Sequence, residues 1–250
     1  MTRRIDDTGF GDISIVQDDE LFCYGMDAVI LAAFAAERIR RKKRKRHRVC
    51  DFCTGNGIVP LILSHKLQDA EIVGVEVQKR CFDLAIENIE LNDLKDRITI
   101  LNMNIKEFCR PKFDKVNPLE NSFDTITMNP PYTKKGCGIQ CDSEYKNIAR
   151  HELLATLDDF IHGSAVLLKE KGDLFIIHRP QRLGDVILTG NRYSLALKEL
   201  RLISGKANQE PNLAVFHLIK NGRPELKVLP QMFLREKNGD FSKEALKLYE

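Results

Sequence analysis

Short apolar stretches recur along the chain, and polar or turn-forming residues bound each of them. Runs of this kind that are rich in β-branched residues are typical of buried strands, and they occur at 48–52, 71–77, 98–102, 123–128 and 173–178. The segments 57–67, 79–91 and 152–168 place apolar residues three or four positions apart, which predicts helices with one buried face. Strands that alternate with helices predict a parallel sheet covered on both faces, so the expected fold class is α/β, doubly wound.

Two further regions flank this alternating core. Ahead of it, the segment 25–39 has the pattern of a helix that begins at Gly25 or Asp27. After it, 195–203 and 212–220 have the pattern of two more strands, which would give a seven-stranded sheet with an antiparallel C-terminal strand. The sequence has no internal repeat, and we expect a single domain with an extension at 1–48, a core at 49–220 and a tail at 221–250.

A glycine-containing turn, Thr54–Gly57, joins the first core strand to the first core helix. Because glycine has no Cβ atom, the backbone can turn tightly there and a ligand can approach it closely. Ligands in open α/β sheets bind at the carboxyl ends of strands, where this turn lies. Glu76, about 20 residues farther on at the next strand end, can accept both hydroxyls of a ribose. The two features indicate a nucleoside-containing cofactor, unless the glycines serve the turn alone.

Two details refine this expectation. The turn lacks both a phosphate-binding Lys-Ser/Thr pair and a G-x-G-x-x-G pattern, which disfavours ATP and NAD. After the third strand, the amides of Asn102 and Asn104 can reach an adenine amino group, or they can simply cap the following turn.

The fourth strand runs directly into Asn129-Pro130-Pro131-Tyr132. Two prolines fix the backbone and remove two amide donors, so the loop presents carbonyl groups. The Asn129 side chain and the Pro130 carbonyl can accept the two hydrogens of an amino group on a flat ring, such as adenine N6, while Tyr132 stacks on the ring. Holding both hydrogens pulls the nitrogen towards sp³ and aims its lone pair at an electrophile. The loop predicts transfer to a planar amine; the plain alternative is a proline turn that only ends the strand.

Charge is concentrated in one place. The chain has 39 Lys and Arg residues against 36 Asp and Glu, but nine of the basic residues lie in the acid-free stretch Arg38–Arg48, here called the basic run. Phosphate binding is the natural use of such a density, although the dipole of the preceding helix also favours cations at its end and a charge run is usually a solvated face. The expected RNA contacts are Arg40, Arg41, Lys42, Lys43, Arg44, Lys45 and Arg46, extended by Lys134 and Lys135 beside the Asn129–Tyr132 loop, here called the catalytic loop.

Composition excludes several classes. The longest apolar run, 28–36, is far short of the roughly 20 residues that span a membrane, and the N-terminus has no apolar signal-peptide core. Seven cysteines, an odd number, fit reduced thiols in a cytoplasmic protein. The pairs Cys50/Cys53 and Cys137/Cys141 have a spacing seen in zinc sites, but the first pair lies in or just after a buried strand, so we expect no metal.

The two motifs together resemble the class I S-adenosylmethionine-dependent methyltransferases that modify planar amino groups. The wider sequence is similar to the bacterial tRNA(Val) adenine-N6 methyltransferases, which act on the adenine 3′ of the anticodon. The similarity runs from about residue 10 to residue 230. The stretches that carry it are Phe22–Phe34, the glycine turn, Asn129–Tyr132 with Gly136-Cys137-Gly138, Ile148–Glu152, His178–Leu183, Asn212-Leu213 and Leu226–Pro230.

This resemblance implies a Rossmann-like fold, S-adenosylmethionine as cofactor and the anticodon region of a tRNA as partner. We expect a monomer and no membrane partner, although the sequence does not identify the oligomeric state. It implies that Gly55 and Glu76 contact the cofactor, that Asp27 and its neighbours line the methionine side, and that Asn129 and Tyr132 contact the target amine. The expected cofactor contacts are Tyr24, Asp27, Asp51, Gly55, Gly57, Glu76, Asn104 and Asn129, and the expected catalytic residues are Asn129, Pro130 and Tyr132. Two positions depart from the family: Cys53 replaces a glycine, and Asn104 replaces an aspartate that often contacts the cofactor adenine.

Three other functions stay open. A release-factor glutamine methyltransferase uses the same tetrapeptide on a side-chain amide, although such enzymes usually carry a helical domain ahead of the first core strand, and at most 48 residues precede it here. A guanine-N2 rRNA methyltransferase is the second alternative. A catalytically inactive RNA-binding protein with this fold is the third.

Overall fold

A nine-stranded, mostly parallel sheet runs through the described part of the chain, which comprises residues 3–21, 23–42, 46–109, 119–132 and 154–250 of a computed structural model. Seven of its strands lie side by side in the order β8-β9-β7-β6-β3-β4-β5, and the short β10 and β11 pair with β8. β9 is antiparallel to both of its neighbours, and the pairings among β3 to β7 are parallel. The strands are β3 (His47–Phe52), β4 (Ala70–Glu76), β5 (Ile98–Asn102), β6 (Phe123–Met128), β7 (Leu168–His178), β8 (Leu195–Lys206), β9 (Leu213–Lys220), β10 (Lys227–Val228) and β11 (Met232–Arg235). The predicted doubly wound α/β fold is therefore confirmed.

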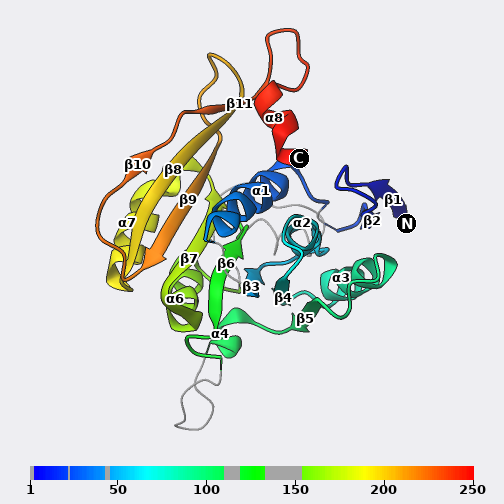
Figure 1. Ribbon diagram of the computed structural model, residues 1–250, viewed down its shortest axis with the longest axis horizontal. Helices are drawn as coiled ribbons and strands as arrows, with labels where there is room; N and C mark the ends of the chain where they lie inside the picture. Colours follow the sequence, from blue (N-terminus) through cyan, green and yellow to red (C-terminus); the bar gives the residue numbers. More distant parts are fainter. Residues whose placement is uncertain (1–2, 22, 43–45, 110–118, 133–153) are drawn as a thin grey trace.

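Helices cover both faces of the sheet (Figure 1). On one face lie α1 (Met26–Arg41), α2 (Ile58–Lys66) and α3 (Lys79–Leu91), and on the other α4 (Ile105–Phe108), α6 (Leu157–Leu167) and α7 (Leu183–Arg192). Because side chains alternate across a strand, β7 sends Phe175 and Ile177 into the first layer and Leu174 and Ile176 into the second. Buried apolar side chains fill both layers, so the sheet is held rigidly between its helices.

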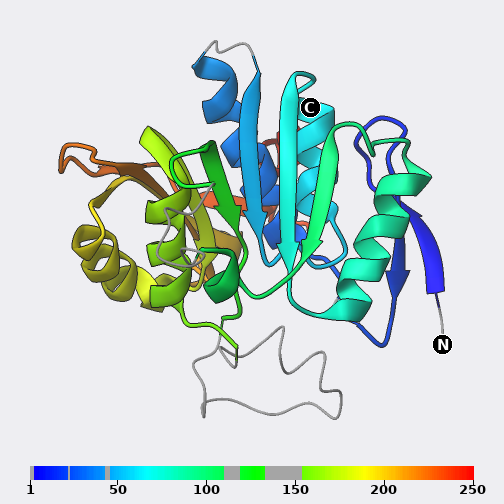
Figure 2. The same ribbon diagram turned by 90° about the horizontal axis from the view of Figure 1, so that it is seen from below.

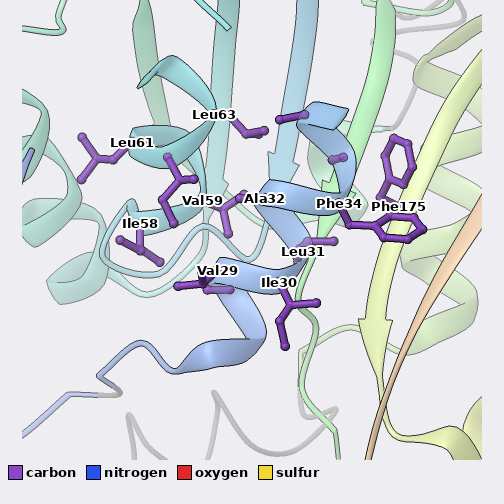
Figure 3. Packing of buried hydrophobic residues seen from close by; sticks show 14 of the residues in the cluster. Val29, Ile30, Leu31, Ala32, Phe34, Ile58, Val59, Leu61, Leu63 and Phe175 are labelled. Carbon is purple, nitrogen blue, oxygen red and sulfur yellow. The ribbon is translucent and has the colours of Figure 1, made fainter. Parts of the chain in front are cut away.

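The first layer is built around α1, whose residues from Ala28 to Ala36 are all buried. A helix that is apolar on every side must be enclosed, and α1 packs against α2 and the sheet (Figure 3). Phe34 meets Phe175 edge to face, with the ring centroids 6.0 Å apart. This packing fixes the start of α1, which lies beside the ends of the strands.

Several elements were not predicted from the sequence. A hairpin of β1 (Arg3–Asp7) and β2 (Ser14–Asp18) packs on α3, where Asn88 accepts a hydrogen bond from the amide of Val16 (2.7 Å) and donates one to its carbonyl (3.1 Å). The 3₁₀ turn η1 (Pro180–Arg182), helix α7 and the C-terminal elements α8 (Lys243–Leu246) and η2 (Lys247–Tyr249) also add to the predicted set. Among the described residues, no helix is both long enough and apolar enough to cross a bilayer.

Because β3 to β7 are parallel, their carboxyl ends lie along one edge of the sheet and their amino ends along the opposite edge. β3, β4, β5, β6 and β7 all end on one of them, here called the pocket edge, and α1 begins there. α1 ends, and β3 begins, at the opposite edge (Figure 2). With 16 residues, α1 separates its two ends by about 24 Å.

Candidate active site

A cavity of about 930 Å³ opens at the pocket edge. Its volume is that of a site for a nucleoside-sized ligand, and it lies where ligands bind in open α/β sheets. Of the residues that were expected to contact a cofactor or a target, all but Asp51, Gly57 and Asn102 contribute to its wall. The lining includes Tyr24, Asp27, Cys53, Thr54, Gly55, Asn56, Glu76, Asn104, Asn129, Pro130, Pro131, Tyr132, Arg179 and Asn212.

The turn after β3 has the backbone that its glycines allow. Gly55 has a φ of 58° and Gly57 a φ of 89°, both in the left-handed region. A Cβ atom at Gly55 would meet no protein atom within 4 Å, so the missing side chain leaves room on the cavity side, whereas Gly57 lies against Ala85. Cys53 also has a left-handed φ, of 58°, a conformation that suits the glycine expected at that position better than a cysteine.

Glu76 holds this turn in place. The residue is 5% exposed, and its two carboxylate oxygens accept hydrogen bonds from the amides of Gly55 (2.9 Å) and Gln78 (2.8 Å). Burial raises the pKa of Glu76, although those amides oppose the rise. A carboxylate at the cavity wall that anchors the turn is suited to accept hydroxyl groups of a ribose as well.

Asp51 has a supporting position instead. It does not line the cavity, and its carboxylate accepts the hydroxyls of Thr54 and Thr127, both at 2.6 Å. Burial raises the pKa of Asp51 to about 7, even though both hydroxyls lower it. Asp51 thus ties the cofactor turn to β6, and its expected direct contact with the cofactor stays a prediction.

The two asparagines at the end of β5, Asn102 and Asn104, differ in position. Asn104 lines the cavity and its side-chain oxygen also accepts the amide of Lys106 (2.9 Å), which caps α4. Asn102 donates to the carbonyls of Glu76 (2.9 Å) and Val77 (3.2 Å) and lies outside the lining. Both side chains therefore bond the backbone of this turn region, and only Asn104 is also placed to meet a ligand.

Asn129 and Tyr132 meet Asp27 in a closed set of hydrogen bonds at the cavity wall. The amide nitrogen of Asn129 lies 3.1 Å from Oδ2 of Asp27, and the hydroxyl of Tyr132 lies 2.7 Å from the same oxygen. The same hydroxyl lies 2.7 Å from Oδ1 of Asn129. Burial and the Asp27 carboxylate raise the pKa of Tyr132, so the hydroxyl keeps its proton.

The ring of Tyr132 has two neighbours that reasoning from single residues missed. The His178 ring centroid lies 5.1 Å from it, and the Arg179 guanidinium lies 5.0 Å from the ring centre. Arg179 donates to the carbonyl of Asn212 (2.9 Å), and among the described residues it has no carboxylate partner. Both residues directly follow or end β7, so the rule that strand ends share one edge would have placed them here.

His178 is a neutral part of this wall. It is fully buried, its Nδ1 accepts the amide of Arg179 (2.7 Å), and burial together with Arg182 and Arg179 lowers its pKa to about 3. An unprotonated imidazole packs against Tyr132 without adding charge.

The residues present fit S-adenosylmethionine. The open space at Gly55 admits a ligand against the backbone, and Glu76 offers acceptors for ribose hydroxyls. Asn104 offers a side-chain amide for the adenine of the cofactor. Asp27 and Tyr24 also line the wall, and Asp27 contacts Asn129 and Tyr132; their contact with the methionine side of the cofactor stays a prediction. Gly57 does not line the cavity and serves the turn.

The basic run lies elsewhere. Its described residues belong to the end of α1 and the start of β3, on the edge opposite the pocket edge (Figure 2). Four of them bond carboxylates: Arg38 with Glu199 and Glu37, Arg41 with Glu37, Lys42 with Asp173, and Arg48 with Glu71. Arg40 and Arg46 are exposed. Lys43, Arg44, Lys45, Lys134, Lys135, Cys137 and Cys141 lie outside the described residues.

Comparison with known proteins bears on this site. The sequence profile of the methyltransferase small domain family matches residues 14–190. A tRNA1(Val) (adenine(37)-N6)-methyltransferase of Bacteroides thetaiotaomicron is 30% identical over 198 residues, which are 78% of this chain and 76% of that protein.

Two solved structures have the same fold. A predicted O-methyltransferase from Agrobacterium tumefaciens superposes with a TM-score of 0.70 at 22% identity and covers 90% of this chain and 95% of its own. The M. jannaschii TYW2 protein, solved in complex with AdoMet, has a TM-score of 0.56 at 14% identity, with 87% and 85% covered. The chain belongs to the methyltransferase small domain family and is an S-adenosylmethionine-dependent methyltransferase with the class I fold.

Proposed function

We propose that this enzyme methylates the N6 amino group of an adenine in tRNA, and specifically adenine 37 of tRNA1(Val). The observation that carries the proposal is the position of Asn129 and Tyr132 on the wall of the cofactor cavity. The similarity to tRNA1(Val) (adenine(37)-N6)-methyltransferases supports the choice of substrate. We expect the enzyme in the cytoplasm, where tRNA is modified.

Asn129 and Pro130 activate the amine in this proposal. The lone pair of an adenine amino nitrogen is delocalised into the ring, so the nitrogen is a poor nucleophile until its hydrogens are held out of the ring plane. Oδ1 of Asn129 and the Pro130 carbonyl accept the two hydrogens, and the same acceptors stabilise the positive charge that develops on nitrogen. S-adenosylmethionine supplies the methyl group when bound. The extra proton leaves to water after transfer, without a dedicated base.

The electrostatics of the pocket edge favour a nucleic-acid substrate. Arg179 lies over the Tyr132 ring beside the cavity, with a backbone carbonyl as its hydrogen-bond acceptor. A guanidinium in that position can bind a phosphate of the target nucleotide while its plane stays on the aromatic ring. The basic run, at the other end of α1, is proposed as a second and more distant contact with the body of the tRNA.

The test is transfer of labelled methyl to tRNA that lacks its modifications, followed by digestion to nucleosides. Label in N6-methyladenosine is expected. In parallel reactions with rRNA and with a release factor, label in methylguanosine would select the rRNA-type alternative, and label in the release factor would select the glutamine alternative. A chain that binds S-adenosylmethionine in calorimetry but labels none of these substrates would overturn the proposal.

Two controls sharpen the assay. A tRNA1(Val) transcript with guanine in place of adenine 37 should accept no label, which tests the nucleotide. The Asn129→Ala variant should bind the cofactor and transfer almost no methyl, which tests the site.

A further inference from the structure

Asp27 joins the start of α1 to the catalytic loop. Its Oδ2 faces both the amide nitrogen of Asn129, at 3.1 Å, and the hydroxyl of Tyr132, at 2.7 Å. These contacts connect residues more than 100 positions apart in the sequence. The carboxylate therefore touches the two residues that the proposed function places on the target amine.

The chemistry of these groups fixes which way the Asn129 amide points. A carboxylate only accepts hydrogen bonds, whereas an amide has a donor end and an acceptor end. Asp27 can therefore face only the NH₂ end of Asn129, and the carbonyl oxygen is left on the other side. Without Asp27, nothing in this set of contacts would prevent the amide from turning its donor end towards the amine.

The single proton of Tyr132 adds a second constraint. The hydroxyl lies 2.7 Å from Oδ2 of Asp27 and 2.7 Å from Oδ1 of Asn129, and it can donate to only one of them. When the amine of the substrate donates to Asn129, the hydroxyl can donate to Asp27 instead. The carboxylate thus keeps the Asn129 oxygen available as an acceptor, and the raised pKa of Tyr132 keeps the proton in place for this exchange.

Asp27 is itself held firmly. Its Oδ1 accepts the amide of Ala28 (3.0 Å) in the first turn of α1, where the helix dipole favours a negative charge. The following residues, Ala28 and Val29, are 3% and 1% exposed, so this turn is embedded in the core. A rigid carboxylate can set the orientation of a side chain on another loop.

We propose that Asp27 is a positioning residue that fixes the amide of Asn129 with its oxygen towards the target amine and holds the Tyr132 hydroxyl away from that oxygen. The inference rests on the proposed function and goes beyond the expected contact of Asp27 with the methionine side of the cofactor. It assigns Asp27 a role in the rate of methyl transfer that acts through Asn129.

An exchange of the two side chains tests this role. Asn129→Asp alone puts two carboxylates about 3 Å apart, and such a pair shares one proton because both cannot ionise together. Its activity should therefore fall as the pH rises and the shared proton is lost. Combining it with Asp27→Asn restores one amide and one carboxylate, now with the amide donor on α1. We expect the double variant to be at least about tenfold faster than Asn129→Asp at pH 8 and to lose that variant's pH dependence.

Asp27→Asn alone gives the second readout. We expect kcat to fall by about 10- to 100-fold at saturating cofactor, because a group that orients a reactant is removed, with the calorimetric Kd for S-adenosylmethionine within about threefold of the wild type. The matched control is Asp185→Asn, which removes a carboxylate from the first turn of α7, away from the cavity lining. That variant should keep the wild-type kcat.

Each failure has its own signature. If the wild type transfers no methyl to adenine, the proposed function is wrong, whatever the variants do. If the wild type is active and Asp27→Asn keeps its kcat but binds the cofactor more than tenfold more weakly, Asp27 is a cofactor contact and the inference is overturned. A double variant no faster than Asn129→Asp at any pH overturns it as well.

Discussion

The two ends of α1 place charged side chains in opposite settings. At its start, Asp27 bonds two uncharged side chains, Asn129 and Tyr132, on the wall of the cavity. At its end, Arg38 bonds the carboxylate of Glu199 and Lys42 bonds that of Asp173. One charge orients neutral groups at the pocket edge, whereas charges cancel in pairs at the opposite edge. The difference indicates that changes at the first end alter the rate of transfer and that changes at the second alter stability.

The same difference changes the meaning of the basic run. The sequence presents nine cations without an acid among them, but the fold brings carboxylates from β4, β7 and β8 to three of these cations, and Glu37 of the same helix pairs with Arg41. Fewer charges than the sequence suggests are then left for RNA. Two of the paired cations, Arg38 and Lys42, hold the end of α1 on the sheet through Glu199 of β8 and Asp173 of β7.

The largest effect is expected from Asn129→Ala at the pocket edge. Removing an acceptor that acts on the developing charge should lower kcat by about 10²- to 10³-fold, while the Kd for the cofactor changes by less than about threefold. Single-turnover transfer and calorimetry measure the two quantities. Full activity in this variant would contradict a role of the start of α1 in the rate of transfer, because the rate would then not depend on the groups that Asp27 orients.

Arg38→Ala at the other end should change stability instead. The Arg38 side chain is 10% exposed, lies 2.8 Å from Glu199 and covers the Phe34 ring, with 3.3 Å between the guanidinium carbon and the ring centre. Its removal leaves a partly buried carboxylate without that partner and should lower the free energy of unfolding by about 2–4 kcal/mol, measured by urea denaturation.

Arg41→Ala is the matched control for this prediction. Arg41 bonds Glu37 on the exposed surface of the same helix, so its removal should change the free energy of unfolding by less than about 0.5 kcal/mol. Equal changes in the two variants would show that burial of the Arg38 pair does not decide the result. Both variants should keep the wild-type kcat at a temperature where they are folded.

The salt dependence of tRNA binding shows which end of α1, the basic run or the pocket edge, contacts the RNA. Replacing Arg40, Lys43, Arg44, Lys45 and Arg46 with Gln should weaken binding, with cofactor binding unchanged. A plot of the logarithm of the association constant against the logarithm of the salt concentration has a negative slope. That slope should become less steep by about 0.7–0.9 for each phosphate that the variant no longer neutralises. Arg179→Gln is the corresponding change at the pocket edge. If only Arg179→Gln reduces the slope, the tRNA is held at the pocket edge and the basic run is a solvated face.

His217 should make the stability of the folded protein depend on pH, through its contacts near the C-terminal end of α1. Its ring nitrogens lie 3.0 Å from Asp173 and 3.2 Å from Glu199, which also bond Lys42 and Arg38. Burial lowers the pKa of His217, but the two carboxylates outweigh it and raise the pKa above its usual value. A raised pKa in the folded protein stabilises it fully below about pH 6.5, and this contribution is lost as the pH rises through the folded pKa.

The corresponding variant is His217→Gln. Its melting temperature should vary less than that of the wild type between pH 6 and pH 9, since the titrating group is gone. A wild type whose melting temperature does not decrease over this range would contradict the raised pKa. Methyl transfer by the variant should keep its pH profile, because His217 does not line the cavity.

Local patterns predicted the elements in which apolar residues recur regularly. The bounds of Ile98–Asn102, Phe123–Met128 and Lys79–Leu91 match because each has a strong apolar period. The strand Arg3–Asp7 carries almost no apolar residue, so it lacks the local signal of a strand. Gly184 and Gly190 lower the intrinsic helix propensity of α7, although its apolar residues have helical spacing.

The site divides in the same way. From the sequence alone, the rule that parallel strand ends meet at one edge predicts that the glycine turn, Glu76 and Asn129 lie together. The contact of Asp27 with Tyr132 spans 105 positions, and the pairing of Lys42 with Asp173 spans 131. Such contacts depend on how α1 lies across the finished sheet, which no local pattern contains.

The smallest expected effect concerns Cys53, at the pocket edge. An L-residue with a φ of 58° is strained by up to about 1–2 kcal/mol, and glycine relieves that strain but loses more backbone entropy on folding. Cys53→Gly should therefore raise the free energy of unfolding by up to about 1 kcal/mol, whereas Cys53→Ala, which keeps a Cβ, should not raise it. Urea denaturation of the two variants separates strain from removal of the thiol. If both stabilise equally, the thiol and not the backbone is the source of the effect, and the left-handed turn beside the start of α1 stores no strain that glycine can relieve.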